Sequence, residues 1–171
     1  MRFTRRHLIE SYIDCQRHAK APAEKRDWHM RRYHALASAF GCLLEKPGDG
    51  PAVPASWLAS HDTPLPFGPG IWSDPNARWS LHHLFLSTVD AYRSIDTPFS
   101  RFVDIPPAVV AMHSRHSATI DARVADLRAS YMALIEDVVE AIWGIGADRV
   151  ITGSELRRHG FDPGERAPSL V

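Results

Sequence analysis

Residues 106–143 hold the pattern that most limits how this chain can fold. Apolar or aromatic side chains recur there with gaps of three or four wherever they adjoin, which is the spacing of one helix face. Pro106 and Pro107 suit a first helical turn, and Gly144 and Gly146 suit a helix end. The pattern predicts one long amphipathic helix. Its stripe consists of Val109, Ile120, Val124, Leu127, Tyr131, Leu134, Val138 and Ile142.

Two shorter helical patterns near the N-terminus predict a basic helical hairpin over residues 4–45. The first helix should span residues 4–20 and the second residues 23–45, with a proline-containing turn between them. Cys15 and Cys42 lie at different distances from that turn, so at the rise of a helix their side chains are far apart. We therefore expect two buried free thiols.

Residues 46–75 differ in kind from the rest of the chain. This stretch contains seven prolines and four glycines, so it cannot be a long regular element, and a Pro/Gly-rich loop is predicted. Large apolar side chains in and just after it suit an ordered loop that fills gaps in the core, a partner-binding or pocket-covering segment, or a linker. The candidate partner anchors are Trp57, Phe67, Trp72 and Trp79.

Further helix signals precede the long helix. Asp74-Pro75 is a strong helix start, and the pattern after it runs to about Ile95, so residues 76–143 should supply the core helices. Thr97-Pro98 can begin a short turn of helix through Phe102.

A capping box over residues 152–155 predicts a short helix near the C-terminus. This helix should span residues 154–159 and end at Gly160. Residues 161–171 are expected to form a flexible tail.

The length and composition agree with a single folded domain. A chain of 171 residues can bury a sizeable core, and its 44% apolar and 23% charged residues are typical of globular proteins. We predict an all-α domain, a bundle of about four main helices with one long helix in the C-terminal half and a long Pro/Gly/Trp-rich loop.

Charge is unevenly distributed, although the net charge is zero. Residues 1–34 carry nine Lys or Arg against four Asp or Glu, and residues 35–171 carry eleven against sixteen. The basic hairpin could dock on the acidic remainder, or it could present a face to an external acidic partner. Nucleic acid is the alternative partner, and the residues that would contact it are Arg5, Arg6, Arg17, Lys25, Arg26, Arg31 and Arg32.

Metal or catalytic chemistry has weaker support in the sequence. His113 and His116 are three residues apart and share a helix face, and His82 with His83 could complete a metal site from the third helix. The sequence contains neither a Glu-x-x-His pair on each of two helices nor a His-Glu-x-x-His motif. The alternatives for these histidines are hydrogen bonding to neighbours in or at the edge of the core, and pH sensing. Glu136, Asp137 and Glu140 fit the solvated side of the long helix.

We therefore predict a non-enzymatic protein-interaction or regulatory module, such as an adaptor, inhibitor or accessory subunit. Its partner would be another protein or a second copy of the chain, contacted through the Trp-rich loop and the charge-polarised surface. A nucleic-acid-binding regulator is the second hypothesis, and a small-ligand or metal-dependent enzyme that uses the helix histidines is the third. No cofactor is predicted. The first residues offer no continuous apolar region, and no run approaches the length of a membrane span, so a cytoplasmic location is expected.

Overall fold

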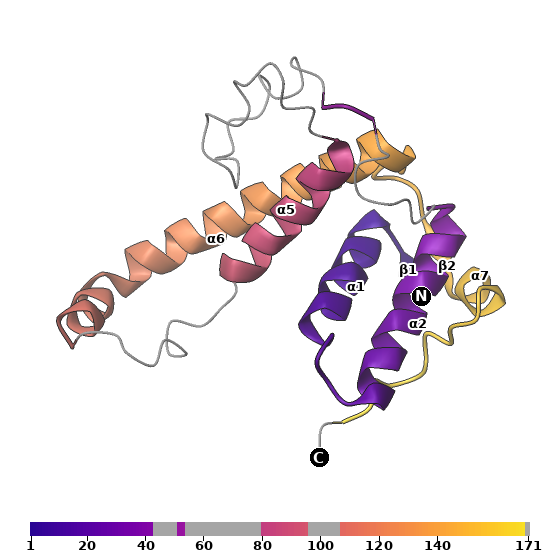
Figure 1. Cartoon of the computed structure of the whole chain (residues 1–171), viewed down its shortest axis with the longest axis horizontal. Helices are drawn as coiled ribbons and strands as arrows, with labels where there is room; N and C mark the ends of the chain where they lie inside the picture. Colours follow the sequence, from indigo (N-terminus) through magenta and orange to yellow (C-terminus); the bar gives the residue numbers. More distant parts are fainter. Residues whose placement is uncertain (43–50, 54–79, 96–106, 170–171) are drawn as a thin grey trace.

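The computed structural model describes residues 1–42, 51–53, 80–95 and 107–169, and for residues 107 and 109–120 it describes the backbone alone. Helices dominate these ranges, and the four longer ones pack in two neighbouring pairs, α1 with α2 and α5 with α6 (Figure 1). The predicted all-α bundle with one long helix is confirmed. The elements are β1 (Arg2–Phe3), α1 (Arg5–Arg17), α2 (Ala23–Phe40), α5 (Leu81–Ile95), α6 (Pro107–Trp143), β2 (Ile151–Thr152) and α7 (Gly153–Arg158).

Helices α1 and α2 form the predicted N-terminal hairpin. Thr4 precedes α1, and its backbone N–H donates to Nδ1 of His7 at 3.0 Å, which satisfies one donor at the helix start. Helix α2 ends at Phe40, because Gly41 adopts the left-handed conformation with φ of 74°. The predicted end at residue 45 is therefore wrong. A glycine inside an otherwise apolar pattern acted here as a helix terminator.

Helix α5 begins later than the sequence predicted. Ser80 forms an isolated antiparallel bridge with Ala52, and the N–H of Leu81 donates to the carbonyl oxygen of Pro51 at 2.9 Å. Because the backbone at Ser80 is extended, one continuous helix from Asp74-Pro75 to Ile95 is excluded. Residues 54–79 lie outside the described part of the chain, as does the predicted helical turn over residues 97–102.

Helix α6 spans 37 residues, which corresponds to about 55 Å. Helix α5 runs antiparallel to it. Trp143 at the end of α6 contacts the ring of Phe85 near the start of α5, whereas Arg128 lies over Tyr92 near the end of α5. Gly144, with φ of 66°, follows α6, as the glycine signal predicted.

Two short strands, neither of them predicted from the sequence, join the N-terminus to the segment just before α7. Strands β1 and β2 pair antiparallel, with Arg2 opposite Thr152 and Phe3 opposite Ile151. Helix α7 follows directly, and the predicted capping box is present, with the N–H of Thr152 donating to the Glu155 carboxylate at 2.7 Å. This hydrogen bond lowers the pKa of Glu155.

The C-terminal segment after α7 lies against the hairpin. Phe161 is buried and packs edge-on against Trp28 of α2, with ring centroids 5.3 Å apart. Asp162 accepts a hydrogen bond from the N–H of Gly164 at 2.9 Å, which lowers the pKa of that carboxyl group. Specific contacts thus occur within the predicted tail, and the mobility of residues 161–171 stays a prediction.

All five described helices contribute to one apolar core. Cys15 and Cys42 are both buried and free, as predicted. The core side chains that are almost fully buried are Ile9, Leu36, Phe40, Leu84, Val89, Leu134, Ile135, Val138, Val139, Ile145 and Leu156.

None of the helices within the described ranges is long and apolar enough to cross a membrane.

Candidate functional site

The basic start of α1 docks on the acidic side of α6. Nη1 of Arg5 lies 2.6 Å from Oε2 of Glu140 and 3.2 Å from the carbonyl oxygen of Ile145. Arg6 makes a two-pronged contact with the Glu136 carboxylate, at 3.2 and 3.0 Å, and this hydrogen bonding raises the pKa of Arg6. These carboxylates, expected on the solvated side of α6, therefore hold the hairpin in place.

A third arginine connects α2 with the C-terminal segment. Nη2 of Arg31 lies 2.9 Å from Oε1 of Glu165. Together with Arg5 and Arg6, Arg31 pairs with an acidic residue of the C-terminal half of the chain. The docking of the basic hairpin on the acidic remainder is therefore present for three of the arginines considered for nucleic acid.

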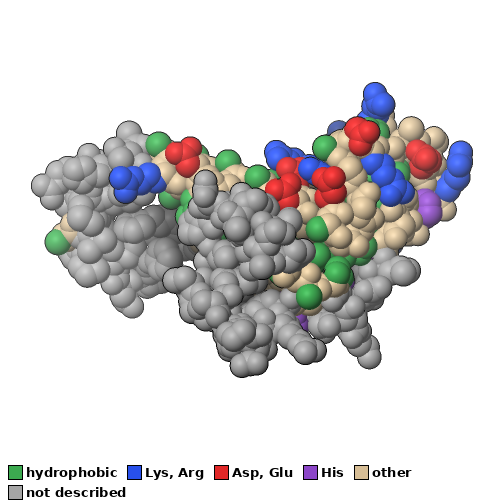
Figure 2. Space-filling model, turned by 90° about the horizontal axis from the view of Figure 1, so that it is seen from above, with side chains coloured by type: hydrophobic (Ala, Val, Ile, Leu, Met, Phe, Trp, Pro, Cys, Tyr) green, Lys and Arg blue, Asp and Glu red, His purple; other side chains and the backbone are tan. Residues whose placement is uncertain are grey.

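The remaining candidate nucleic-acid residues do not form one free basic patch. Arg17 lies 3.7 Å from Asp14 and Arg26 lies 3.4 Å from Asp27, each on its own helix. Arg32 stands over the ring of Trp28, 5.8 Å from its centroid, and Lys25 is half-buried. On the face shown in Figure 2, Lys and Arg side chains lie interspersed with Asp and Glu.

The structure separates the two histidine pairs proposed for a metal site, His82 with His83 on α5 and His113 with His116 on α6. His82 is buried and lies edge-on to Trp143, at the end of α6. His116 stands 27 residues earlier on the same helix, which is about 40 Å at the α-helical rise. A site that joins the α5 histidines to His113 and His116 is therefore excluded by the backbone. The His83 ring is exposed and contacts the hydroxyl of Ser80 at 3.0 Å.

Nothing in the described ranges assembles a metal centre or an activated thiol. No cluster of three or more His, Cys, Asp or Glu side chains there could hold a metal ion. Burial raises the pKa of Cys15 to about 11 and that of Cys42 to about 11, so both thiols are protonated at neutral pH. The side chains of His113 and His116 lie outside the described set.

A polar hollow of about 290 Å³ lies where α1, α5 and α6 meet. Two carboxylates and two guanidinium groups line it, together with one aliphatic and one aromatic side chain. The pairing of Arg17 with Asp14 and the contact of Arg128 with Tyr92 already use these groups, so a charged ligand would have to displace existing partners. The lining residues are Glu10, Ile13, Asp14, Arg17, Tyr92 and Arg128.

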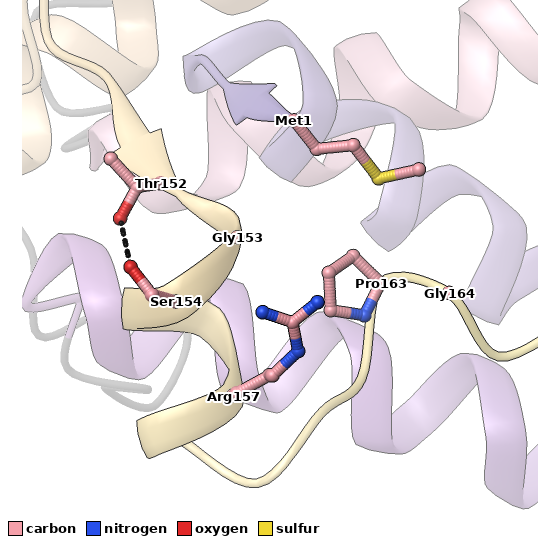
Figure 3. A pocket seen from close by; sticks show the side chains of 7 residues that line it. All are labelled: Met1, Thr152, Gly153, Ser154, Arg157, Pro163 and Gly164. Atoms are coloured by element: carbon pink, nitrogen blue, oxygen red, sulfur yellow. Dashed lines mark hydrogen bonds between the residues drawn. The ribbon is translucent and has the colours of Figure 1, made fainter.

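A wider hollow of about 450 Å³ opens between the N-terminus, the β2–α7 turn and the C-terminal segment (Figure 3). Met1, Arg157 and Pro163 stand around it. The Ser154 hydroxyl lies 3.1 Å from the Thr152 hydroxyl, which is not a base that could activate it, and Arg157 lies 3.4 Å from the Asp162 carboxylate. The hollow thus carries no arrangement typical of catalysis.

Burial changes abruptly along α6. Between residues 131 and 139, six side chains are buried, whereas between residues 121 and 130 none is. Val124 and Leu127 belong to the apolar stripe but are only half-buried. We refer to residues 121–130 as the α6 extension. Part of its apolar stripe is therefore only partly covered, although Leu127 still packs against the core.

The predicted partner anchors Trp57, Phe67, Trp72 and Trp79 all lie outside the described residues. Their role stays a prediction. Two stacked histidines, His18 and His29, face each other across the hairpin turn, and this pair was not predicted from the sequence. Their positions four residues before and seven residues after Pro22 were the signal that could have suggested the pairing.

No known family model matches the chain, and no curated protein or solved structure matches it either. Function must therefore be inferred from the surfaces described above.

Proposed function

We propose that this protein is a non-enzymatic protein-interaction module, an adaptor, inhibitor or accessory subunit. Its activity would be contact with another protein or with a second copy of itself. The observation that carries the proposal is the α6 extension, a continuous helix in which no side chain from residue 121 to residue 130 is buried.

The energetics of helices support this proposal. Helical stability in proteins comes mainly from the packing of an apolar face rather than from intrinsic propensity. Val124 and Leu127 present that face only half-covered. Because full burial of such side chains contributes on the order of 1.5–3 kcal/mol each, a partner that covers them would gain binding free energy.

The charge pairs favour a protein partner over nucleic acid. Arg5, Arg6 and Arg31 already contact carboxylates of other segments. Phosphate binding by these residues would have to break those pairs first, which lowers the free energy available for binding. In the alternative function, nucleic-acid binding, the cations near the hairpin turn, such as Lys20 and Arg26, would contact the phosphates.

The test is a pull-down of the tagged full chain from its native lysate, with and without nuclease, together with a solution mass from light scattering. Val124→Glu should weaken association with protein or with a second copy by at least about tenfold, because a charge would enter the contact. Ala141→Glu is the matched control, since Ala141 is exposed on the core-proximal half of α6. Recovery of nucleic acid alone, or of protein only without nuclease, would favour the nucleic-acid alternative. Association that Val124→Glu leaves unchanged would show that the α6 extension is not the contact.

The Trp-rich loop is tested separately. If Trp57 and Trp72 anchor a partner, their replacement by alanine should abolish association and leave helical content and Tm nearly unchanged. Trp28→Ala is the contrasting variant, because Trp28 is buried and its loss should lower Tm. A large fall in Tm in the loop variants would instead place Trp57 and Trp72 in the core.

A further inference from the structure

The turn of the N-terminal hairpin brings two imidazole rings face to face. His18 follows the last residue of α1, and His29 lies in the second turn of α2. The ring centroids are 4.0 Å apart and the ring planes differ by 8°, so the rings are stacked in parallel. Nδ1 of His18 donates to the carbonyl oxygen of Asp14 at 2.8 Å, which orients this ring.

The His29 side chain is buried. Its exposed fraction is 7%, and neither ring nitrogen has a hydrogen-bond partner among the described residues. The ring of Trp28 lies edge-on at 4.9 Å. The thiol of Cys15 donates to the backbone carbonyl of His29 at 3.2 Å, so α1 holds this residue from the other side.

The charged groups around His29 come from both helices. From α1, Asp14 favours the protonated ring, whereas His18, just after α1, opposes it. From α2, Lys25 and Arg32 oppose protonation as well. Phe161 of the C-terminal segment covers the neighbouring Trp28 with an apolar ring. Protonation of His29 would thus place a cation beside other cations in a site with little access to water.

We propose that the stacked pair His18–His29 is a proton-sensitive lock on the closed end of the α1–α2 hairpin. With both rings neutral, the stack holds the end of α1 against α2. When His29 takes up a proton, repulsion and the need for hydration drive the rings apart and this end of the hairpin opens locally.

The direction of the effect follows from proton linkage. The pKa of His29 lies below its ordinary value. Burial is the largest cause of this shift, and the neighbouring His18 is the second. The unfolded or opened chain therefore binds a proton at a higher pH than the folded chain does. The stability that depends on the neutral stack is complete well above about pH 6.5 and is lost as the pH falls below that value. Each unit by which the pKa is lowered corresponds to about a tenfold change in the opening constant at low pH.

The first measurement is an NMR titration of the histidine rings in the full chain between pH 8 and pH 5, combined with urea unfolding at pH 7.5 and pH 5.5. This range avoids the titration of ordinary carboxyl groups. The variant His29→Phe keeps a ring in the stack but cannot take up a proton. His34→Gln is the matched control, because His34 is exposed on the same helix.

We expect the unfolding constant to rise on acidification by a larger factor in the unmodified chain than in His29→Phe, and by the same factor in His34→Gln as in the unmodified chain. Amide hydrogen exchange corrected for pH should accelerate near residues 18–29 more than in α5. Equal factors in the unmodified chain and His29→Phe would overturn the proposal. So would titration of His29 at or above the ordinary pKa, a measurement on the unmodified chain that decides the matter even if His29→Phe does not fold.

Discussion

Arg5 at the start of α1 donates a hydrogen bond to Glu140 near the end of α6 across 2.6 Å, although 135 positions of sequence separate the two residues. The same guanidinium also donates to the carbonyl oxygen of Ile145, just beyond α6. Arg5 is 9% exposed whereas the Glu140 side chain is exposed, so this contact joins the hairpin to the long helix at the boundary between the core and the surface.

Replacing Arg5 by methionine should therefore destabilise the fold. The substitution keeps the apolar stem but leaves the Ile145 carbonyl without its side-chain donor. We expect a loss of about 1–3 kcal/mol in the free energy of unfolding, measured with urea. Because Glu140 is exposed to solvent, loss of the ion pair should account for only a small part of this decrease. Arg2→Met is the control, because Arg2 is exposed. Equal stabilities for the two variants would contradict this prediction.

The packing of α6 predicts a larger effect at Leu134. This side chain is 1% exposed and lies in the middle of the core. Leu134→Ala should cost about 2–5 kcal/mol, and Leu134→Asp should prevent folding because it buries an unpaired charge. Ala133→Asp, at the neighbouring exposed position, should cost only about 1 kcal/mol, because aspartate has a lower helix propensity than alanine and would stand one turn before Glu136 and Asp137. Retention of the native circular dichroism spectrum by Leu134→Asp would refute the central placement of α6.

Gly41 provides a test of helix termination. Its φ of 74° suits glycine, and a β-carbon there would meet no atom within 4 Å. The cost of Gly41→Ala should therefore be conformational, about 1–2 kcal/mol, and should appear as a lower Tm. Gly41→Asn should cost less, because asparagine tolerates the left-handed region better. If alanine and asparagine were equally harmless, the left-handed end of α2 would be in doubt.

The two cysteines should react slowly in the native protein. Burial raises the pKa of both Cys15 and Cys42 to about 11, so at pH 8 only a small fraction of either thiol is ionised. We expect iodoacetamide labelling, followed by mass spectrometry, to be slow without denaturant and rapid in urea. Prompt labelling of either cysteine under native conditions would mean that the packing around that cysteine opens often.

Local signals explain which features could be predicted from the residues. The stripe through Leu134 and the glycines after Trp143 defined α6, because side-chain spacing and backbone preference depend only on near neighbours. The same holds for the capping box before α7. Predictions failed where a tertiary contact intervened. Ser80 pairs with Ala52 in extended backbone, and this pairing places the start of α5 after the position that the proline signal indicated.

The candidate sites were less predictable than the fold. Charge counts left two alternatives for the basic hairpin, docking on the acidic remainder or on an external partner, and they did not identify Glu136 and Glu140 as its contacts. The four-histidine metal site failed because α5 and α6 run antiparallel, which places His82 beside Trp143 and far from His116. Helix direction and register depend on packing, and no spacing within one segment reveals them.

The sequence by itself determined the helical class, the extent of the long helix and the chemical character of each helix face, since these follow from the periodicity of neighbouring residues. Only the tertiary structure decided which residues meet. Arg5 with Glu140, Phe3 with Ile151 and His18 with His29 come together because the elements pack to bury their apolar stripes, and the polar contacts form wherever that packing places them.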